Sequence, residues 1–245
     1  MEREADAVRF LSCGDTALVV EFGSAVDRTV NDRVLGLDAQ VRAAGLPGVV
    51  ETVPTFRSLM VHYDPVATAA ADLERAIRAL LERVGAVKRQ ARLWRIPVCY
   101  EGEYAPDLAE VARRTGLDPD DVVRLHTTVR FHVYMLGFLP GFPYLGDLPE
   151  RLILPRRKDP RLRVPAGSVA VATNLTAVYA HESPGGWHLI GRTPVVFFDA
   201  KKDRPSVLAP GDAVVFKPIG KDEFQRLAVI AATDARGLSS EALAP

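Results

Sequence analysis

The sequence predicts an α+β protein of two domains: a small N-terminal ferredoxin-like α+β domain over residues 1–88 and a β-barrel domain over residues 89–220. The first observation is the order strand, helix, strand, strand, helix before residue 85, which is typical of a split βαβ layer. The second is a series of short apolar runs separated by glycine and proline after residue 130, which is typical of a barrel. A chain of 245 residues is long enough to form two such cores.

The N-terminal elements are predicted from the spacing of apolar residues. Residues 8–13 and 17–22 are apolar runs separated by Gly14-Asp15, which indicates a hairpin. Two segments carry apolar residues at steps of three and four and are followed by glycine, which predicts helices at residues 26–44 and 69–84. Two more strands are expected at residues 48–53 and 59–63.

The barrel half is predicted in the same way, and the polar, basic segment 85–92 is expected to mark the domain boundary. Asp118 is suited to cap a helix, because Pro119 follows at the first helical position. The predicted helices span residues 107–115 and 119–127, and residues 221–245 form a helix and a fraying tail. The predicted strands are residues 94–100, 131–136, 168–173, 176–180, 186–191, 194–199 and 206–219.

Composition excludes several classes of protein. Lys plus Arg and Asp plus Glu both number 31, so the balanced charge predicts neither a nucleic-acid nor a membrane-surface partner. No apolar run approaches the roughly 20 residues that span a bilayer, and the acidic N-terminus is unlike a signal peptide. Cys13 and Cys99 are far apart in sequence, which argues against a disulfide framework and favours a cytoplasmic protein.

The common catalytic motifs are absent. The phosphate-binding pattern fails around Gly220-Lys221, because Val215 stands at its first glycine position. The sequence has no G-x-S-x-G and no H-E-x-x-H motif, and the five histidines do not have the spacing of metal ligands. We therefore expect no metal site, and any catalysis must use a less common arrangement.

Three segments of the barrel half have the composition of a binding surface: LGFLPGFPYLGDLP (136–149), PRRKDPRLRVPAGS (155–168) and HESPGGWHLIGRTP (181–194). Glycines let the backbone approach a ligand, prolines fix the loop beforehand, aromatic rings form an apolar wall, and arginines recognise carboxylate or phosphate. The candidate binding residues are Gly141, Phe142, Pro143, Tyr144, Arg156, Arg157, Ser168, Ser183, Pro184, Gly185, Gly186 and Trp187.

Each of these features also has a purely structural interpretation. The aromatic residues of the first segment are equally suited to plug one end of the barrel. The arginines are typical of a solvated face, and Ser-Pro-Gly-Gly is typical of a turn. His126 and His132 fit structural roles better than acid–base roles, and His188 lies on a strand that could present it to either side.

In this order and spacing, MLGFLPGFPYLGDLPERL, PRRKDPRLRVPAGSVAVA and ESPGGWHLIGRTP resemble the allophanate hydrolase subunit 1 family. This is also called the KipI family, and its members include the B subunit of 5-oxoprolinase. GDTALVVEFG, VVETVPTFRSLMVHYDP and IPVCYEGEYAPDLAEVARRTGL extend the resemblance over nearly the whole chain, to about Ile219. The resemblance implies that the barrel is cyclophilin-like. It also implies a partner, the allophanate hydrolase subunit 2 chain, which is KipA-like and corresponds to the C component of 5-oxoprolinase.

The activity that the resemblance implies is ATP-dependent opening of 5-oxoproline to glutamate, or a related reaction on an amide. Arg156, Arg157 and Arg161 are then expected to hold anions, and His126 or His188 to move a proton. The loops 141–144 and 183–187 are expected to supply substrate walls and amide donors.

The sequence departs from the family pattern beside the third segment. Members usually carry glycine near Thr173 and Ala177, glutamine at Leu175 and proline at Ala180. Loss of an amide donor there would change a substrate contact. A second function therefore stays open: a non-catalytic binding protein that regulates a histidine kinase. A cyclophilin-like barrel is also the fold of proline isomerases, but the arginine-and-aromatic signature of those enzymes is absent from this sequence.

Overall fold

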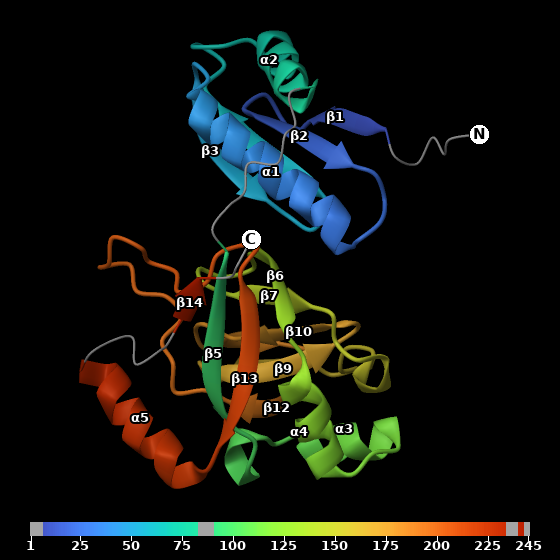
Figure 1. The fold of residues 1–245 in the computed structure, drawn as a ribbon, viewed down its shortest axis with the longest axis vertical. Coiled ribbons are helices and arrows are strands. Elements are labelled where there is room, and N and C mark those ends of the chain that lie inside the picture. Colours follow the sequence, from blue (N-terminus) through green and yellow to red (C-terminus); the bar gives the residue numbers. More distant parts are fainter. Residues whose placement is uncertain (1–6, 83–90, 234–239, 243–245) are drawn as a thin grey trace. The chain divides into compact units, whose positions relative to one another are not determined.

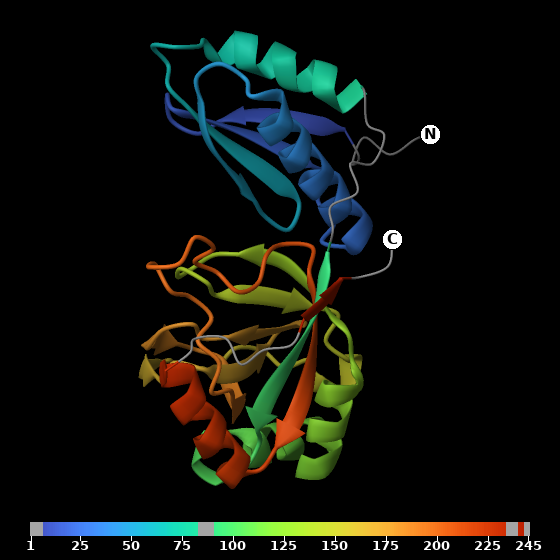
Figure 2. The ribbon, with the colours of Figure 1, turned by 60° about the vertical axis from the view of Figure 1, so that its left-hand side comes forward.

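The computed structural model describes residues 7–82, 91–233 and 240–242, which belong to two compact units (Figures 1 and 2). One unit contains residues 7–82, and the other begins at Ala91. Most of the predicted boundary segment, residues 85–90, lies outside the described residues, as do the first six residues of the chain.

The N-terminal unit is a four-stranded antiparallel sheet with two helices packed against it. In the order β1-β2-β4-β3, both β2 and β3 are antiparallel to β4, so β2, α1 and β3 form a split βαβ unit with β4 inserted between its strands. The elements are β1 (Val8–Ser12), β2 (Ala17–Phe22), α1 (Arg28–Ala44), β3 (Val49–Pro54), β4 (Ser58–Tyr63) and α2 (Ala70–Glu82).

Capping and burial explain why the two helices form. The side chain of Asp27 accepts a hydrogen bond of 2.9 Å from the backbone N–H of Val30, and Gly45 ends α1 in the left-handed conformation. Leu37 of α1 and Ile77 of α2 are buried against the sheet. The ferredoxin-like order predicted from the apolar periodicity is therefore confirmed.

In the second unit, seven strands of the described chain form a closed barrel in the order β12-β9-β10-β7-β6-β13-β5, and β12 pairs with β5 to close it. Strands β5 and β13 are parallel neighbours (Figure 1). The strands are β5 (Arg92–Cys99), β6 (Phe131–Leu136), β7 (Pro143–Gly146), β9 (Ser168–Ala172), β10 (Leu175–Val178), β12 (His188–Arg192) and β13 (Ala213–Ile219). The predicted α+β class with a barrel is thus confirmed.

The remaining elements surround this barrel. Strands β8 and β11 pair only with each other, as a short ribbon within the described part of the chain. Helices α3 and α4 contribute to the main core, where Val111 and Val122 are fully buried. The bounds are η2 (Gly102–Tyr104), α3 (Leu108–Thr115), α4 (Pro119–Thr128), η3 (Glu150–Leu152), β8 (Arg161–Val164), β11 (Ser183–Gly185), α5 (Lys221–Thr233) and β14 (Ser240–Ala242).

The barrel strands have apolar residues on both faces, so the unit has two cores. On β9, Val171 joins the main core, whereas its neighbour Ala172 joins a smaller cluster. Val164 of β8 also belongs to that cluster, so the β8–β11 ribbon packs against this second face of the barrel strands. The cluster contains Phe142, Val164, Ala170, Ala172, Ala177, Tyr179, Trp187 and Leu189.

The structure adds the strands β7, β8 and β11, which were not predicted, and it corrects the strand prediction in three further places. Residues 194–199 form no strand beyond an isolated bridge between Phe198 and Ser206. The predicted strand 206–219 begins only at Ala213, because Pro210-Gly211 makes a turn in which Gly211 has a φ of 89°. Residues 240–242 were expected to fray, but β14 pairs with β5. The β14 strand forms through main-chain hydrogen bonds to β5, which the pattern of side chains in the sequence does not predict.

Candidate binding pocket

A cavity of about 480 Å³ opens on the second face of the barrel strands. It brings together the three segments whose composition predicted a binding surface, and adds the β9–β10 turn. Its lining residues are Phe138, Phe142, Tyr144, Arg156, Pro160, Thr173, Tyr179, Pro184, Gly185, Gly186 and Trp187.

Aromatic side chains form most of the apolar wall, with Phe142 at their centre. Its ring centroid lies 5.0 Å from that of Tyr144, 5.2 Å from Tyr179 and 6.3 Å from Trp187. Three of these rings are buried, because they belong to the smaller apolar cluster. Edge-to-face packing of this kind fixes ring orientations, so the wall is formed before any ligand binds.

Arg156 gives the pocket its positive charge. Its side chain is exposed, and among the described residues it has no carboxylate within ion-pair distance. Burial raises the pKa of Tyr144 and raises that of Tyr179 to about 12, and the nearby Arg156 charge opposes both shifts. Both phenols are therefore neutral hydrogen-bonding groups at physiological pH.

Two glycines let the backbone form part of the wall. A Cβ atom at Gly185 would lie 2.2 Å from the hydroxyl oxygen of Tyr179, so no larger residue fits there. Gly186 is less constrained, since a Cβ atom there would meet nothing closer than 3.7 Å. The carbonyl of Gly186 accepts a hydrogen bond of 2.8 Å from the backbone N–H of Arg157, which joins two of the pocket segments.

The other two arginines that we expected to hold anions are paired with a buried carboxylate. Arg161 donates to the two oxygens of Asp107 at 2.9 and 2.6 Å, and Arg157 donates to one of them at 3.2 Å. Asp107 also accepts the backbone N–H of Leu189 at 2.7 Å and is only 3% exposed. Arg157 and Arg161 do not line the pocket, and through Asp107 they hold the segments on either side of it together.

His126 lies in the main core, away from the pocket, and is completely buried. Its ring stacks on Phe216 with centroids 4.7 Å apart and forms hydrogen bonds with Tyr100 at 2.8 Å and Thr176 at 3.0 Å. Burial lowers the pKa of His126 to about 3, so the ring is neutral. The structure therefore gives His126 no access to a ligand in the pocket, and we propose a structural role for it.

His188 and Ser183 flank the pocket segment 184–187 without lining the cavity. His188 is fully buried, and its Nε2 lies 3.0 Å from the carbonyl oxygen of Pro155 and 3.4 Å from a guanidinium nitrogen of Arg114. The Nδ1 atom of His188 and the hydroxyl of Ser183 are buried without a hydrogen-bond partner in the described part of the chain. Neither residue is placed to move a proton inside the pocket.

The remaining predicted residues, Gly141, Pro143 and Ser168, do not line the cavity. Ser168 begins β9 and is 3% exposed, and its carbonyl accepts the backbone N–H of Tyr179 at 2.9 Å. Gly141, with a φ of 76°, precedes β7, and Pro143 is the first residue of that strand. Sequence reasoning missed Asp107 and Tyr179 because their roles depend on pairing between segments that are distant along the chain.

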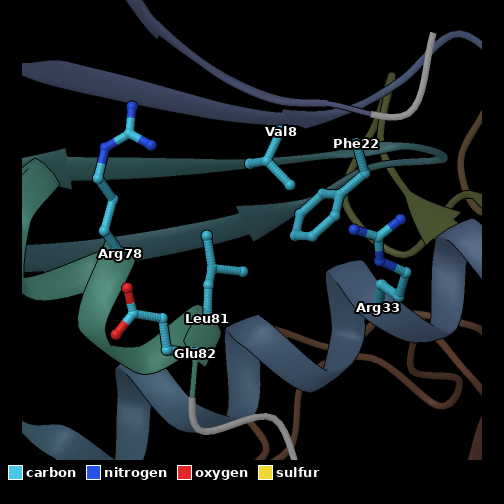
Figure 3. Close-up of a pocket in the computed structure, with 6 residues that line it drawn as sticks. All are labelled: Val8, Phe22, Arg33, Arg78, Leu81 and Glu82. Atoms are coloured by element: carbon cyan, nitrogen blue, oxygen red, sulfur yellow. The ribbon is translucent and has the colours of Figure 1, made fainter. Parts of the chain in front are cut away.

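The N-terminal unit has a cavity of its own, of about 400 Å³, lined by residues of β1, β2 and both helices (Figure 3). The guanidinium of Arg33 lies 5.1 Å from the ring centroid of Phe22. Figure 3 shows Val8 and Leu81 between Arg33 and Arg78. No residue that we predicted for the site lies here, so the barrel pocket is the stronger candidate.

Two kinds of feature are missing from residues 7–82, 91–233 and 240–242. None of the helices in these ranges combines the length and the apolar character required to cross a bilayer. In the same ranges, no three His, Cys, Asp or Glu side chains are grouped so that they could hold a metal ion.

Comparison with known proteins gives consistent matches. The model of the carboxyltransferase domain, subdomain C and D, matches residues 8–208. The chain is 38% identical to the B subunit of 5-oxoprolinase from Bacillus subtilis over 225 residues, which cover 86% of this chain and 92% of the relative. It is 43% identical to the same protein of Escherichia coli O157:H7, with 84% and 93% covered. The crystal structure of TTHA0988 superposes with a TM-score of 0.74 at 38% identity, and the match covers 87% of this chain but 40% of that one.

Proposed function

The chain belongs to the carboxyltransferase subdomain C and D family, and we propose that it is a 5-oxoprolinase subunit of the B type. In this proposal it takes part in the ATP-dependent opening of 5-oxoproline to glutamate, together with a second chain. The observation that carries the proposal is the preformed aromatic pocket with Arg156 at its wall, whose guanidinium pairs with no carboxylate of the described residues.

The pocket has the chemistry that a small cyclic amide acid requires. Arg156 can bind a carboxylate through two hydrogen bonds, and the rings around Phe142 offer an apolar surface to the methylene groups. Tyr144 and Tyr179 are neutral at physiological pH, so neither phenol repels the carboxylate of such a ligand. We propose that this chain binds and orients the lactam acid and limits its contact with water.

The same residues do not fit a nucleotide triphosphate. Arg157 and Arg161 are occupied by Asp107, so Arg156 is the one guanidinium that the described residues leave free at the cavity. A triphosphate requires several cationic or backbone N–H partners. We therefore propose that ATP is bound outside this pocket.

A partner chain follows from the same comparisons. The names of the B. subtilis and E. coli relatives describe one subunit of an assembly. This chain matches 40% of TTHA0988, so that longer protein joins a similar region to a further stretch of polypeptide. We propose that the partner is the chain called allophanate hydrolase subunit 2 or KipA-like in this family, the C component of 5-oxoprolinase.

Reconstitution tests this proposal. The chain is co-expressed with a subunit 2 chain, and glutamate formation from 5-oxoproline and ATP is measured. We expect Arg156→Ala to lower kcat/KM by about 10- to 100-fold, since a hydrogen-bonded ion pair contributes about 1.5–3 kcal/mol. Arg163→Ala is the matched control, because Arg163 is 79% exposed and pairs with Glu182.

Three outcomes contradict parts of the proposal. If the wild-type pair forms no glutamate, the assigned reaction is wrong. If the pair is active and Arg156→Ala has no effect, the reaction stands and the pocket assignment fails. If this chain lowers the autophosphorylation of a histidine kinase and does no chemistry with subunit 2, the regulatory alternative holds instead.

A further inference from the structure

Backbone strain is concentrated at the pocket. Among the described residues other than glycine, Phe138, Asp147 and Thr173 have a positive φ, of 67°, 70° and 53°. Phe138 and Thr173 both line the cavity, whereas Asp147 does not. Residues in this left-handed conformation persist only where the surrounding structure imposes it, and they cluster at ligand sites.

Thr173 is the least expected of the three. Ala172 of β9 pairs with Leu175 of β10, so Thr173 and Asn174 form a two-residue hairpin turn. Thr173 has a positive φ and Asn174 does not, which is the pattern of a turn whose first central residue is normally glycine. A β-branched side chain is a conformational outlier there, since its Cβ substituents crowd the backbone.

Neighbouring contacts hold the turn and its side chain in place. The backbone N–H of Thr173 donates to the carbonyl of Leu154, which tethers the turn to the segment before Arg156. The Thr173 hydroxyl donates to the carbonyl of Ala172 at 2.6 Å, which fixes the side chain at the cavity. Glycine would keep the first of these bonds and avoid the strain, so the turn itself does not require threonine.

From this juxtaposition we propose that Thr173 is a specificity-determining residue of the pocket. Its side chain lines the same cavity as the segment 184–187, and in this proposal it limits the size of the ring that binds, so that a five-membered ring acid is preferred to a larger one. The inference rests on the proposed function, because it assumes that the pocket takes a ring-bearing carboxylate.

The test compares ring sizes on the full chain by isothermal titration calorimetry. The probes are 5-oxoproline, its six-membered homologue 6-oxopiperidine-2-carboxylate, and the corresponding cyclopentane and cyclohexane carboxylates. One methylene group in a close-fitting pocket changes affinity by about 10-fold or more, so we expect the wild type to prefer each five-membered ring by at least that factor. In Thr173→Gly the preference should fall to about 3-fold or less.

Asp147→Gly is the matched control. It relieves the same kind of backbone strain at an exposed residue that does not line the pocket, so the ring preference should stay at the wild-type value. Both variants place glycine at a positive φ, and each also loses a side-chain hydrogen bond, so the melting temperatures of both are measured to confirm that the variants are folded at the temperature of the titration.

The inference is overturned if Thr173→Gly keeps the wild-type preference, if Asp147→Gly loses it equally, or if the wild type does not discriminate. Should the cycloalkane acids bind and the lactam acids not, the proposed function fails while the ring-size comparison still decides the role of Thr173. If none of the four acids binds, both the proposed function and the inference are overturned.

Discussion

Asp107→Asn is the perturbation that best tests how the pocket is built. The substitution keeps the shape of the side chain but removes the negative charge that Arg157 and Arg161 share. One amide oxygen remains to accept the backbone N–H of Leu189, whereas the two-oxygen contact with Arg161 is lost.

The expected loss of stability follows from burial. The side chain of Asp107 is 4% exposed and those of Arg157 and Arg161 are 23% and 26% exposed, so water cannot fully replace the lost partner. Removing one member of a buried pair costs about 3–5 kcal/mol, and we take the lower end because an acceptor oxygen remains. For a unit of this size, about 3 kcal/mol corresponds to a melting temperature lower by about 6–12 °C.

Urea denaturation followed by tryptophan fluorescence measures this loss. Both tryptophans of the chain, Trp94 and Trp187, belong to the barrel unit, so the signal reports on that unit alone. We expect the midpoint to fall without a change in slope, since the same surface is exposed on unfolding.

Glu182→Gln is the matched control. Glu182 accepts two hydrogen bonds from Arg163 of β8 on a single oxygen, and its side chain is 51% exposed, so it offers an exposed arginine–carboxylate pair for comparison with Asp107 and Arg161. An exposed pair contributes at most about 1 kcal/mol. If Asp107→Asn is no more destabilising than Glu182→Gln, the assignment of Asp107 as the residue that ties these segments together is refuted.

Three further predictions concern single groups. Burial lowers the pKa of His126 from 6.5 to about 3, so between these pH values a proton binds preferentially to the unfolded chain and the folded state loses stability as the pH falls. His126→Gln should reduce this pH dependence of stability by about one proton, measured by urea titrations at several pH values. Gly185→Ala should abolish activity of the reconstituted pair, because its Cβ would meet the Tyr179 hydroxyl, whereas Gly186→Ala should keep it. Cys99 is buried and burial raises the pKa of its thiol, whereas Cys13 is exposed, so a maleimide should label only Cys13 until the chain is unfolded.

The local pattern of apolar residues, helix caps and glycines was sufficient to predict most elements of the fold. The helices α1, α2, α3 and α4 begin and end within two residues of the positions that apolar spacing, caps and glycines predict. The composition of three glycine- and proline-rich segments also indicated a preformed surface, and these segments meet at one cavity. Such features depend on neighbours within a few residues, which the sequence displays directly.

Only the tertiary structure decided what each charged group does. Arg156, Arg157 and Arg161 are equivalent in the sequence, yet one faces the pocket and two are bound by Asp107, some fifty residues earlier in the chain. In the sequence, nothing distinguishes His126 from a histidine that takes part in catalysis. In the structure, burial in the core makes it a neutral structural group. The sequence determines which chemical groups are available, whereas burial and long-range pairing determine which of them remain free to bind a ligand.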